Sequence, residues 1–389
     1  MTKLEELIKE FCPTGVEYEK IGNAVEYEQP TKYIVTSTDY NDCEGTPVLT
    51  AGQTFILGYT NEKDGIYAAS KEKPVIIFDD FTGAFKWVDF PFKVKSSAMK
   101  MLTAKKDVAI LRYIYHCMGH LDFSSSEHKR LWIGIYSEFQ IPVPPIPVQE
   151  EIVRILDSFT ELTAELTAEL TARKKQYDYY SERMLSFTNE KVPQYSLDEL
   201  CDIVDYRGKT PLKSDDGIFL VTAKNIRFGY IDYNKSKEYI PKDTYHEVMR
   251  RGNPKIGDIL ITTEAPCGNV AMVDKENIAL AQRVIKYRPK DQKILNNRYL
   301  LHILMGNEFQ EKLAQASTGG TVKGIKGSKL QKLTIPVPSL KTQNKIVQVL
   351  DNFDSICSDL KIGLPAEIEA RTKQYEYYRD KLLSFKEKS

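Results

Sequence analysis

Hydrophobic and polar positions form the same long pattern twice along this chain. Each copy begins with a proline-rich segment, continues with apolar residues at every third or fourth position, and closes on a tyrosine-rich run. The copies extend from Ile141 to Phe187 (IPVPPIPVQEEIVRILDSF to ARKKQYDYYSERMLSF) and from Ile335 to Phe385 (IPVPSLKTQNKIVQVLDNF to ARTKQYEYYRDKLLSF). Apolar residues at this spacing predict an amphipathic helix, whereas prolines favour extended chain. Because the copies lie half a chain apart, the sequence indicates the tandem duplication of a domain followed by a long helix.

The first of these helical stretches contains a four-residue repeat, TELTAELTAELTAR. Roughly 35 to 40 residues can form one continuous helix here, some 55 Å long at about 1.5 Å per residue. Four residues turn a helix by about 400°, so each TAEL unit shifts the downstream chain by about 6 Å along the axis and about 40° around it. The repeat is either a solvated helix or an adjustable spacer. In the second copy, Gly363, Leu364 and Pro365 predict a break, because Gly is typical just beyond a helix end and Pro suits a first turn.

Strand-like patterns dominate the segments that precede the two helical stretches. Short apolar or alternating runs, separated by Gly, Pro, Asp and Asn, fill residues 16–140, with one helix expected from Asp107 to His120. The same order returns in residues 192–334: VLTA at 48–51 reappears as LVTA at 220–223, and the VIIF run reappears within DILIT.

The expected fold is therefore α/β (α+β). It comprises two similar domains with small mixed sheets, joined by two long antiparallel coiled-coil helical regions in a pseudo-two-fold arrangement. The predicted segments are residues 1–146 with a short N-terminal helix, 147–190 for the spacer helix, 191–338 for the second domain and 339–389 for the final helical region.

The charge of the chain is balanced overall but not locally. Formal net charge is zero, yet residues 192–334 hold 23 Lys or Arg against 17 Asp or Glu, and residues 90–106 contain five lysines and no acid. Local basic patches are compatible with a nucleic-acid partner. We find no apolar run of the roughly 18 residues that span a bilayer and no secretory pattern, so we expect a cytoplasmic protein without a membrane partner. Six scattered cysteines without a C-x-x-C pair argue against a disulfide framework or a zinc ribbon.

Motifs for catalysis are mostly missing from the sequence. It lacks the Asp/Asn-Pro-Pro-Tyr/Phe element of amino-methyltransferases and a Gly-x-Gly loop for a methyl donor. The nearest approach to a phosphate-binding loop, Gly319 to Gly324, is followed by Ile325 where a lysine is required. His116 and His120 share a helical face, but without a third ligand we interpret them as ordinary histidines. We therefore expect no catalytic residue and no metal site.

Candidate DNA-binding residues lie in polar turns of both halves. In the second half, one turn offers Arg207, Lys209 and Thr210, and a segment after a strand offers Lys224, Asn225 and Arg227. Arg and Asn are residue types that read guanine and adenine edges. Lys323 and Lys326, in the glycine-rich segment 317–329, suit phosphate contact or are plain linker residues. In the first half the candidates are Thr31, Lys32, Gln53, Thr54, Tyr59, Lys93, Lys95 and Lys100.

Taken together, the paired motifs resemble the specificity subunits of type I restriction-modification systems. The resemblance covers nearly the whole chain and rests on the duplicated I-P-V-P…Q…I-V…L-D-x-F and K-Q-Y-[DE]-Y-Y…L-S-F segments, with CPTGVEY at 12–18, DYRGKTP at 205–211 and GDILIT at 257–262. In that family each half is a target recognition domain that reads one part of a split double-stranded DNA site. The helical regions space these domains and dock two modification (methyltransferase) subunits, and restriction (translocase/nuclease) subunits then join.

The resemblance implies a non-catalytic subunit of an adenine-N6 methyltransferase and restriction complex. No cofactor is then expected in this chain, since S-adenosylmethionine belongs to the modification subunit and ATP and Mg to the restriction subunit. The helical motifs supply the expected partner-binding residues, which are Gln149, Ile152, Leu156, Phe159, Gln343, Ile346, Leu350 and Phe353. Two alternatives remain: a self-contained methyltransferase or nuclease with divergent motifs, and a coiled-coil adaptor with no DNA role.

Overall fold

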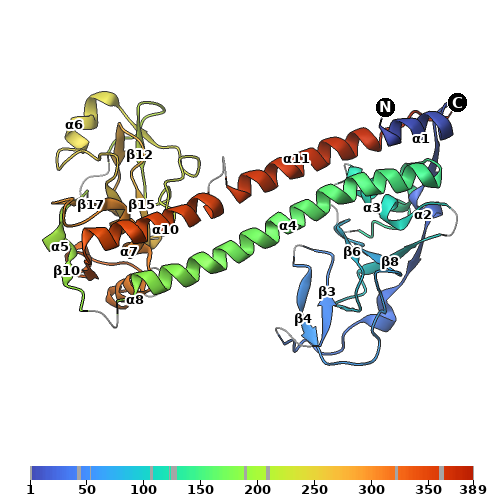
Figure 1. Cartoon of the computed structure of the whole chain (residues 1–389), viewed down its shortest axis with the longest axis horizontal. Coiled ribbons are helices and arrows are strands. Elements are labelled where there is room, and N and C mark those ends of the chain that lie inside the picture. Colours follow the sequence, from blue (N-terminus) through green and yellow to red (C-terminus); the bar gives the residue numbers. More distant parts are fainter. Residues whose placement is uncertain are drawn as a thin grey trace. The chain divides into compact units, whose positions relative to one another are not determined.

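The structure is a computed structural model in which the chain divides into two compact units (Figure 1). Unit 1 comprises residues 1–166 and 367–389, and unit 2 comprises residues 167–366. The structure describes residues 2–41, 45–52, 54–105, 108–121, 123, 129–187, 191–206, 211–319, 323–358 and 363–388.

The described residues of unit 1 form two small sheets and a two-stranded ribbon. The larger sheet has the order β2-β8-β5-β6, with all neighbours antiparallel, and the smaller has the order β4-β3-β7, in which β3 and β7 are parallel. The ribbon pairs β1 with β9. The bounds are β1 Glu17–Lys20, β2 Val25–Glu28, β3 Thr46–Leu49, β4 Ile56–Thr60, β5 Val75–Asp79, β6 Phe85–Val88, β7 Lys93–Val94, β8 Met99–Ala104 and β9 Gln140–Val143. The helices preceding α4 are α1 Lys3–Phe11, α2 Ile21–Ala24, η1 Pro30–Tyr33, α3 Leu111–His120 and η2 Tyr136–Glu138.

Unit 2 repeats this topology strand for strand. Its sheets have the orders β11-β17-β14-β15 and β13-β12-β16, again with one parallel pair in the smaller sheet, and its ribbon pairs β10 with β18. The bounds are β10 Gln194–Ser196, β11 Cys201–Asp205, β12 Ile218–Val221, β13 Tyr239–Ile240, β14 Ile259–Thr263, β15 Cys267–Met272, β16 Ile278–Leu280, β17 Val284–Pro289 and β18 Thr334–Pro336. The helices are α5 Leu197–Leu200, η3 Lys242–Thr244, α6 Tyr245–Val248, α7 Asn297–Met305, α8 Asn307–Ala316 and α9 Gly327–Leu330.

This correspondence confirms the predicted α/β class and the duplication. The first two residues of VLTA and of LVTA lie on β3 and β12, which occupy the same central place in the two smaller sheets. VIIF lies on β5, and all of DILIT except Asp258 lies on β14; these strands occupy the same place in the larger sheets. Both of these strands are almost wholly buried, which is why their sequences are nearly continuous apolar runs rather than alternating ones.

The long helices follow the proline-rich segments, as the sequence predicts. Helix α4 (Ile146–Leu185) is continuous over 40 residues, which confirms the expected length. The second copy consists of α10 (Leu340–Ser358) and α11 (Leu364–Leu382), so the predicted break is also confirmed, with Pro365 in the first turn of α11. In unit 1, α11 runs beside the first part of α4 (Figure 1). No helix within the described ranges is long and apolar enough to cross a membrane.

The predicted start of one helix is wrong. Helix α3 begins at Leu111 rather than near Asp107, which lies outside the described residues. Ile110 has an extended conformation, and its amide donates 2.9 Å to the side-chain oxygen of Gln149. A side chain from a distant helix therefore accepts from the N-cap amide, a bond that a Glu or Gln three positions into the helix makes in a capping box.

Candidate nucleic-acid interface

The glutamine of each repeated motif holds a helix onto its own domain. Gln149 Nε2 donates 2.7 Å to the Pro144 carbonyl while its oxygen accepts from Ile110. Gln343 does the same in unit 2, since Nε2 donates 2.9 Å to the Pro338 carbonyl and Oε1 accepts from the Asn296 amide at 2.9 Å. Both side chains are fully buried. Because a buried amide without partners is costly, these hydrogen bonds stabilise the packing of each helix on its own domain.

A second duplicated network joins an Arg, a His and an Asp. In unit 1, Asp157 accepts from Arg112 Nε at 2.7 Å and from His116 Nε2 at 2.8 Å, and His116 Nδ1 lies 3.0 Å from the Tyr375 hydroxyl. Burial lowers the pKa of His116, although the hydrogen bond with Asp157 opposes that effect. A neutral His116 that donates from Nε2 to Asp157 then accepts a hydrogen bond from the Tyr375 hydroxyl at Nδ1.

The unit 2 network has the same core and one additional acid. Asp351 bonds to Arg298 Nε at 3.1 Å and to His302 Nε2 at 2.6 Å. Burial alone would raise the pKa of Asp351, but these bonds outweigh it and lower the pKa to about 2. Asp354, where unit 1 has Thr160, has a pKa raised by burial. The carboxylates and His302 lie close enough to hold a cation, yet Arg298 already supplies the positive charge there, so we interpret the group as an ion-pair network.

The expectation that the helical motif residues bind partners is wrong for most of them. Gln149, Ile152, Leu156, Gln343, Ile346 and Leu350 are buried in the cores of their own units. The two phenylalanines are half-buried: Phe159 stacks on Tyr378 with ring centroids 5.2 Å apart, and Phe353 stacks on Tyr180 at 5.7 Å. The apolar periodicity of these helices thus serves helix-to-domain packing.

Polar hollows open at strand ends in both units. In unit 1, one hollow of about 450 Å³ is lined by Lys32, Lys93 and Glu62, among others. In unit 2, a hollow of about 360 Å³ lies where the ends of β14 and β17 meet the glycine-rich segment, and it is lined in part by Glu264, Arg283 and Lys326. Charged groups in open hollows on strand-end loops are suited to contact a polar macromolecule.

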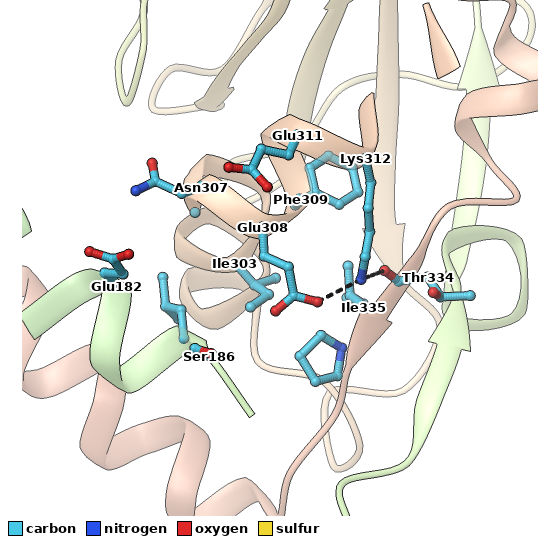
Figure 2. Close-up of a pocket in the computed structure, with 13 residues that line it drawn as sticks. Glu182, Ser186, Ile303, Asn307, Glu308, Phe309, Glu311, Lys312, Thr334 and Ile335 are labelled. Carbon is cyan, nitrogen blue, oxygen red and sulfur yellow. Dashed lines mark hydrogen bonds and ion pairs between the residues drawn. The ribbon is translucent and has the colours of Figure 1, made fainter. Parts of the chain in front are cut away.

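A smaller cavity in unit 2 has a different character (Figure 2). It has a volume of about 190 Å³, and the apolar residues that line it include Ile303, Phe309 and Ile335. Lys312 bridges Glu308 at 2.8 Å and the Thr334 carbonyl at 3.5 Å (Figure 2). This volume is below the roughly 300 to 1,000 Å³ of usual ligand pockets, so the cavity is too small for a nucleotide-sized cofactor.

Comparison with known proteins places the two halves in one family. Residues 13–173 and 189–370 each match the type I restriction modification DNA specificity domain. The chain belongs to this family. A type I restriction enzyme specificity subunit of Escherichia coli is 41% identical over 403 residues, covering 99% of this chain and 98% of that protein. A putative type I restriction enzyme specificity subunit of Haemophilus influenzae is 32% identical over 294 residues, covering 70% of this chain and 72% of that protein.

A solved specificity-subunit structure has the same fold. The type I restriction-modification S subunit from M. genitalium matches with a TM-score of 0.61 and covers 95% of this chain and 96% of that one, at 14% identity. At such low identity the likeness concerns the fold alone.

Several predicted DNA-binding residues of this type I specificity chain are exposed, on the short helix η1 or on loops. They are Thr31, Lys32, Thr54, Lys95, Lys224, Lys323 and Lys326. Tyr59 and Arg227 are half-buried, and Arg227 Nε lies 3.8 Å from Asp232. The roles of these residues stay predictions. Gln53, Arg207, Lys209 and Thr210 lie outside the described residues.

Three of the predicted DNA contacts are wrong because their polar groups are used internally. Lys100 is fully buried, 3.1 Å from Asp80. Lys93 is also buried, pairs with Glu62 at 3.0 Å and donates 2.7 Å to the Asp64 carbonyl, so it lines the unit 1 hollow without presenting a free ammonium. Asn225 is buried and donates to the carbonyls of Asp232 and Ser236. Side chains so engaged cannot reach a base edge.

The Arg–His–Asp networks are features that sequence reasoning missed, although a signal was present. Both halves contain R-Y-x-x-H, starting at Arg112 and at Arg298, and both contain L-D-x-F. The tyrosine of R-Y-x-x-H makes the same contact in both halves: Tyr113 and Tyr299 each donate a hydrogen bond of 2.9 Å to a proline carbonyl of the proline-rich segment, at Pro142 and Pro336. Reading the duplicated motifs as pairs would have identified this contact set.

Proposed function

We propose that this chain is the non-catalytic DNA-recognition subunit of a type I restriction-modification complex and that each domain reads one half of a split, asymmetric double-stranded DNA site. The observation that carries the proposal is the duplicated topology with diverged strand-end loops. Identical scaffolds with different loops can present two different sets of side chains to DNA, whereas one set would suffice for a symmetric site.

The proposal includes two modification subunits as partners and places the chemistry in other chains. S-adenosylmethionine would bind to the modification subunits, and ATP and Mg to restriction subunits that join them. The absence of methyltransferase motifs from the sequence supports this division of labour. A cytoplasmic location fits a partner set built around DNA.

Modification subunits would dock on the outward faces of the long helices rather than on the buried motif residues. Tyr179 in unit 2 and Tyr377 in unit 1 hold the same place in the two copies of K-Q-Y-[DE]-Y-Y, and they are 55% and 61% exposed. Exposed tyrosines are enriched at protein interfaces because they combine a large apolar surface with a polar end. Two equivalent sites on one chain suit two copies of one partner.

The experiment that tests the function is the mapping of methylated positions. The chain is assembled with its modification subunits, and DNA containing randomised sequence is methylated and sequenced. We expect one bipartite sequence with two different halves. Methylation without sequence preference would contradict the proposal, and methyl transfer or cleavage by the isolated chain would establish the self-contained enzyme instead.

A matched pair of variants tests docking. Tyr179→Ala together with Tyr377→Ala should weaken binding of the modification subunits while the isolated chain remains as stable as the wild type. Unchanged binding would reject these faces as docking sites. Glu161→Ala, an exposed change elsewhere on α4, serves as the control.

A further inference from the structure

The end of the larger sheet is built identically in both units, but it carries different side chains. In unit 1, the Asp80 amide donates 2.7 Å to the Ala98 carbonyl, and the Asp80 carbonyl accepts from the Leu131 amide at 2.7 Å. In unit 2, the Thr263 amide donates 2.9 Å to the Arg283 carbonyl, and the Thr263 carbonyl accepts from the Ile325 amide at 3.0 Å. Asp80 therefore corresponds to Thr263, and Ala98 to Arg283.

In unit 1 this junction is closed by the internal contacts of its acid. Asp80 Oδ1 accepts from the amides of Leu131 and Trp132, at 3.2 and 2.8 Å, while Oδ2 pairs with buried Lys100 at 3.1 Å. Ala98 has no side-chain group that could reach a ligand. At the equivalent place in unit 2 the junction borders the open hollow of about 360 Å³ and presents Arg283 and Glu264.

The backbone holds Arg283 in an unfavourable conformation. Its φ is 69°, in the left-handed region that side-chain-bearing residues other than Asn and Asp rarely adopt. The Arg283 carbonyl accepts from both the amide and the hydroxyl of Thr263, at 2.9 and 3.3 Å, which keeps the residue in place. Strained backbone of this kind concentrates at functional sites, where the position of a side chain matters more than its local stability.

Neighbouring charges orient the Arg283 side chain and indicate what it can bind. Its Nε lies 3.0 Å from a Glu264 carboxylate oxygen, and the two side chains remain 55% and 42% exposed. A phosphate would be repelled by Glu264, whereas a base edge is neutral. Guanine offers two acceptors to a guanidinium fork, and the cytosine paired with it offers a donor to a carboxylate. Lys326, which lines the same hollow, is placed to contact an adjacent phosphate.

We propose that Arg283, oriented by Glu264, reads a guanine of the half-site recognised by unit 2. This proposal rests on the proposed function, since it presupposes that unit 2 reads DNA. Arg283 is then a specificity-determining residue, and Glu264 is a positioning residue that also disfavours the phosphate backbone. Among the described residues of the unit 1 junction, Ala98 stands where unit 2 has Arg283, so the two half-sites differ at this position.

The test uses the chain assembled with its modification subunits and DNA in which each position of both half-sites is varied in turn. Arg283→Gly removes the guanidinium group without straining the backbone, because glycine readily adopts a positive φ. Arg283→Lys keeps the charge but loses the bidentate geometry. We expect both variants to lower the preference for one G·C pair of a single half-site by roughly 5- to 150-fold, with the other half-site unchanged. Glu264→Gln should weaken the preference at that same base pair.

The outcomes separate the inference from the proposed function. If the wild-type complex reads no split site, the proposed function itself fails. If the wild type reads a split site and Arg283→Gly leaves every base preference unaltered, or reduces methylation equally on all sequences, only the role of Arg283 is overturned. Arg250→Ala, an exposed arginine of the same unit, is the matched control, and urea unfolding of each variant confirms that the fold is intact.

Discussion

Replacing Gln343 with leucine tests whether this side chain stabilises unit 2 or binds a partner subunit. The side chain makes three hydrogen bonds, accepting from the Asn296 amide and donating to the carbonyls of Ile294 and Pro338 at 2.8 and 2.9 Å. Leucine has nearly the same volume but can make none of them. Each buried group left without a partner costs about 1 to 3 kcal/mol. Only the bond to Pro338 is fully buried, so we take the lower end for the other two and expect a loss of about 3 to 5 kcal/mol.

The measurement is urea unfolding of the isolated chain, combined with hydrogen exchange at the start of α7. Gln343→Leu should lower the midpoint of unit 2 and accelerate exchange of the Asn296 amide, because that amide loses its acceptor. Gln149→Leu should destabilise unit 1 by about 2 to 4 kcal/mol, since it loses one partly buried bond to Ile110 and one fully buried bond to Pro144.

Gln374→Leu is the matched control, because Gln374 is exposed and accepts only a surface bond from Arg371. A surface change of this kind should alter stability by less than about 0.5 kcal/mol. The reasoning is refuted if Gln343→Leu leaves both the urea midpoint and the exchange rate unchanged while weakening the binding of modification subunits. That result would return the glutamine to the partner interface.

Three further changes test the spacer, the unit 1 hollow and the buried lysine. Inserting one TAEL unit into α4 should change the gap between the half-sites while both halves stay the same in methylation mapping; an altered half-site with an unaltered gap would refute the spacer. Hydrogen bonds from Ser37, then from Lys93 and Thr36, hold the pKa of Glu62 down from 4.5 to about 2. The resulting stabilisation is present above about pH 4.5 and is lost as the pH falls toward 2. Glu62→Gln should therefore make the urea midpoint of unit 1 depend less on pH between these values, and an unchanged pH dependence would contradict this. Lys100→Met should destabilise unit 1 by about 3 to 5 kcal/mol, because it leaves Asp80 buried without its cation. Lys95→Met, the same change at an exposed lysine, should have little effect on stability. Equal effects of the two changes in urea unfolding would argue against a structural role of Lys100.

Sequence reasoning predicted the elements whose signals are local. The length of α4 followed from apolar spacing, and the break before α11 followed from Gly363 and Pro365, because backbone restrictions of glycine and proline act within a few residues. The start of α3 could not be predicted in this way, since Gln149, 39 positions away from Ile110, makes the bond there.

The assignment of side chains to interfaces was less successful for a related physical reason. Residue type predicts which ligand a side chain can bind, but burial decides whether it is available. Lys100 and Asn225 have the chemistry of DNA contacts and are consumed by internal partners. Arg283 was not predicted as a DNA-binding residue because it follows an ordinary strand-like run. The residues next to it in the sequence indicate neither its positive φ nor the proximity of Glu264.

The sequence by itself determined the duplication, the α/β character, the long helix and the family, because repeats, periodicity and motifs are properties of residue order. Only the tertiary structure decided which face of each motif points inward and which charges remain exposed. Those outcomes depend on contacts between residues far apart in the chain, such as Asp157 with His116 or Gln343 with Pro338 and Asn296. Burial makes such hydrogen bonds necessary, because an unpaired buried polar group is costly, and burial has no counterpart in a local pattern.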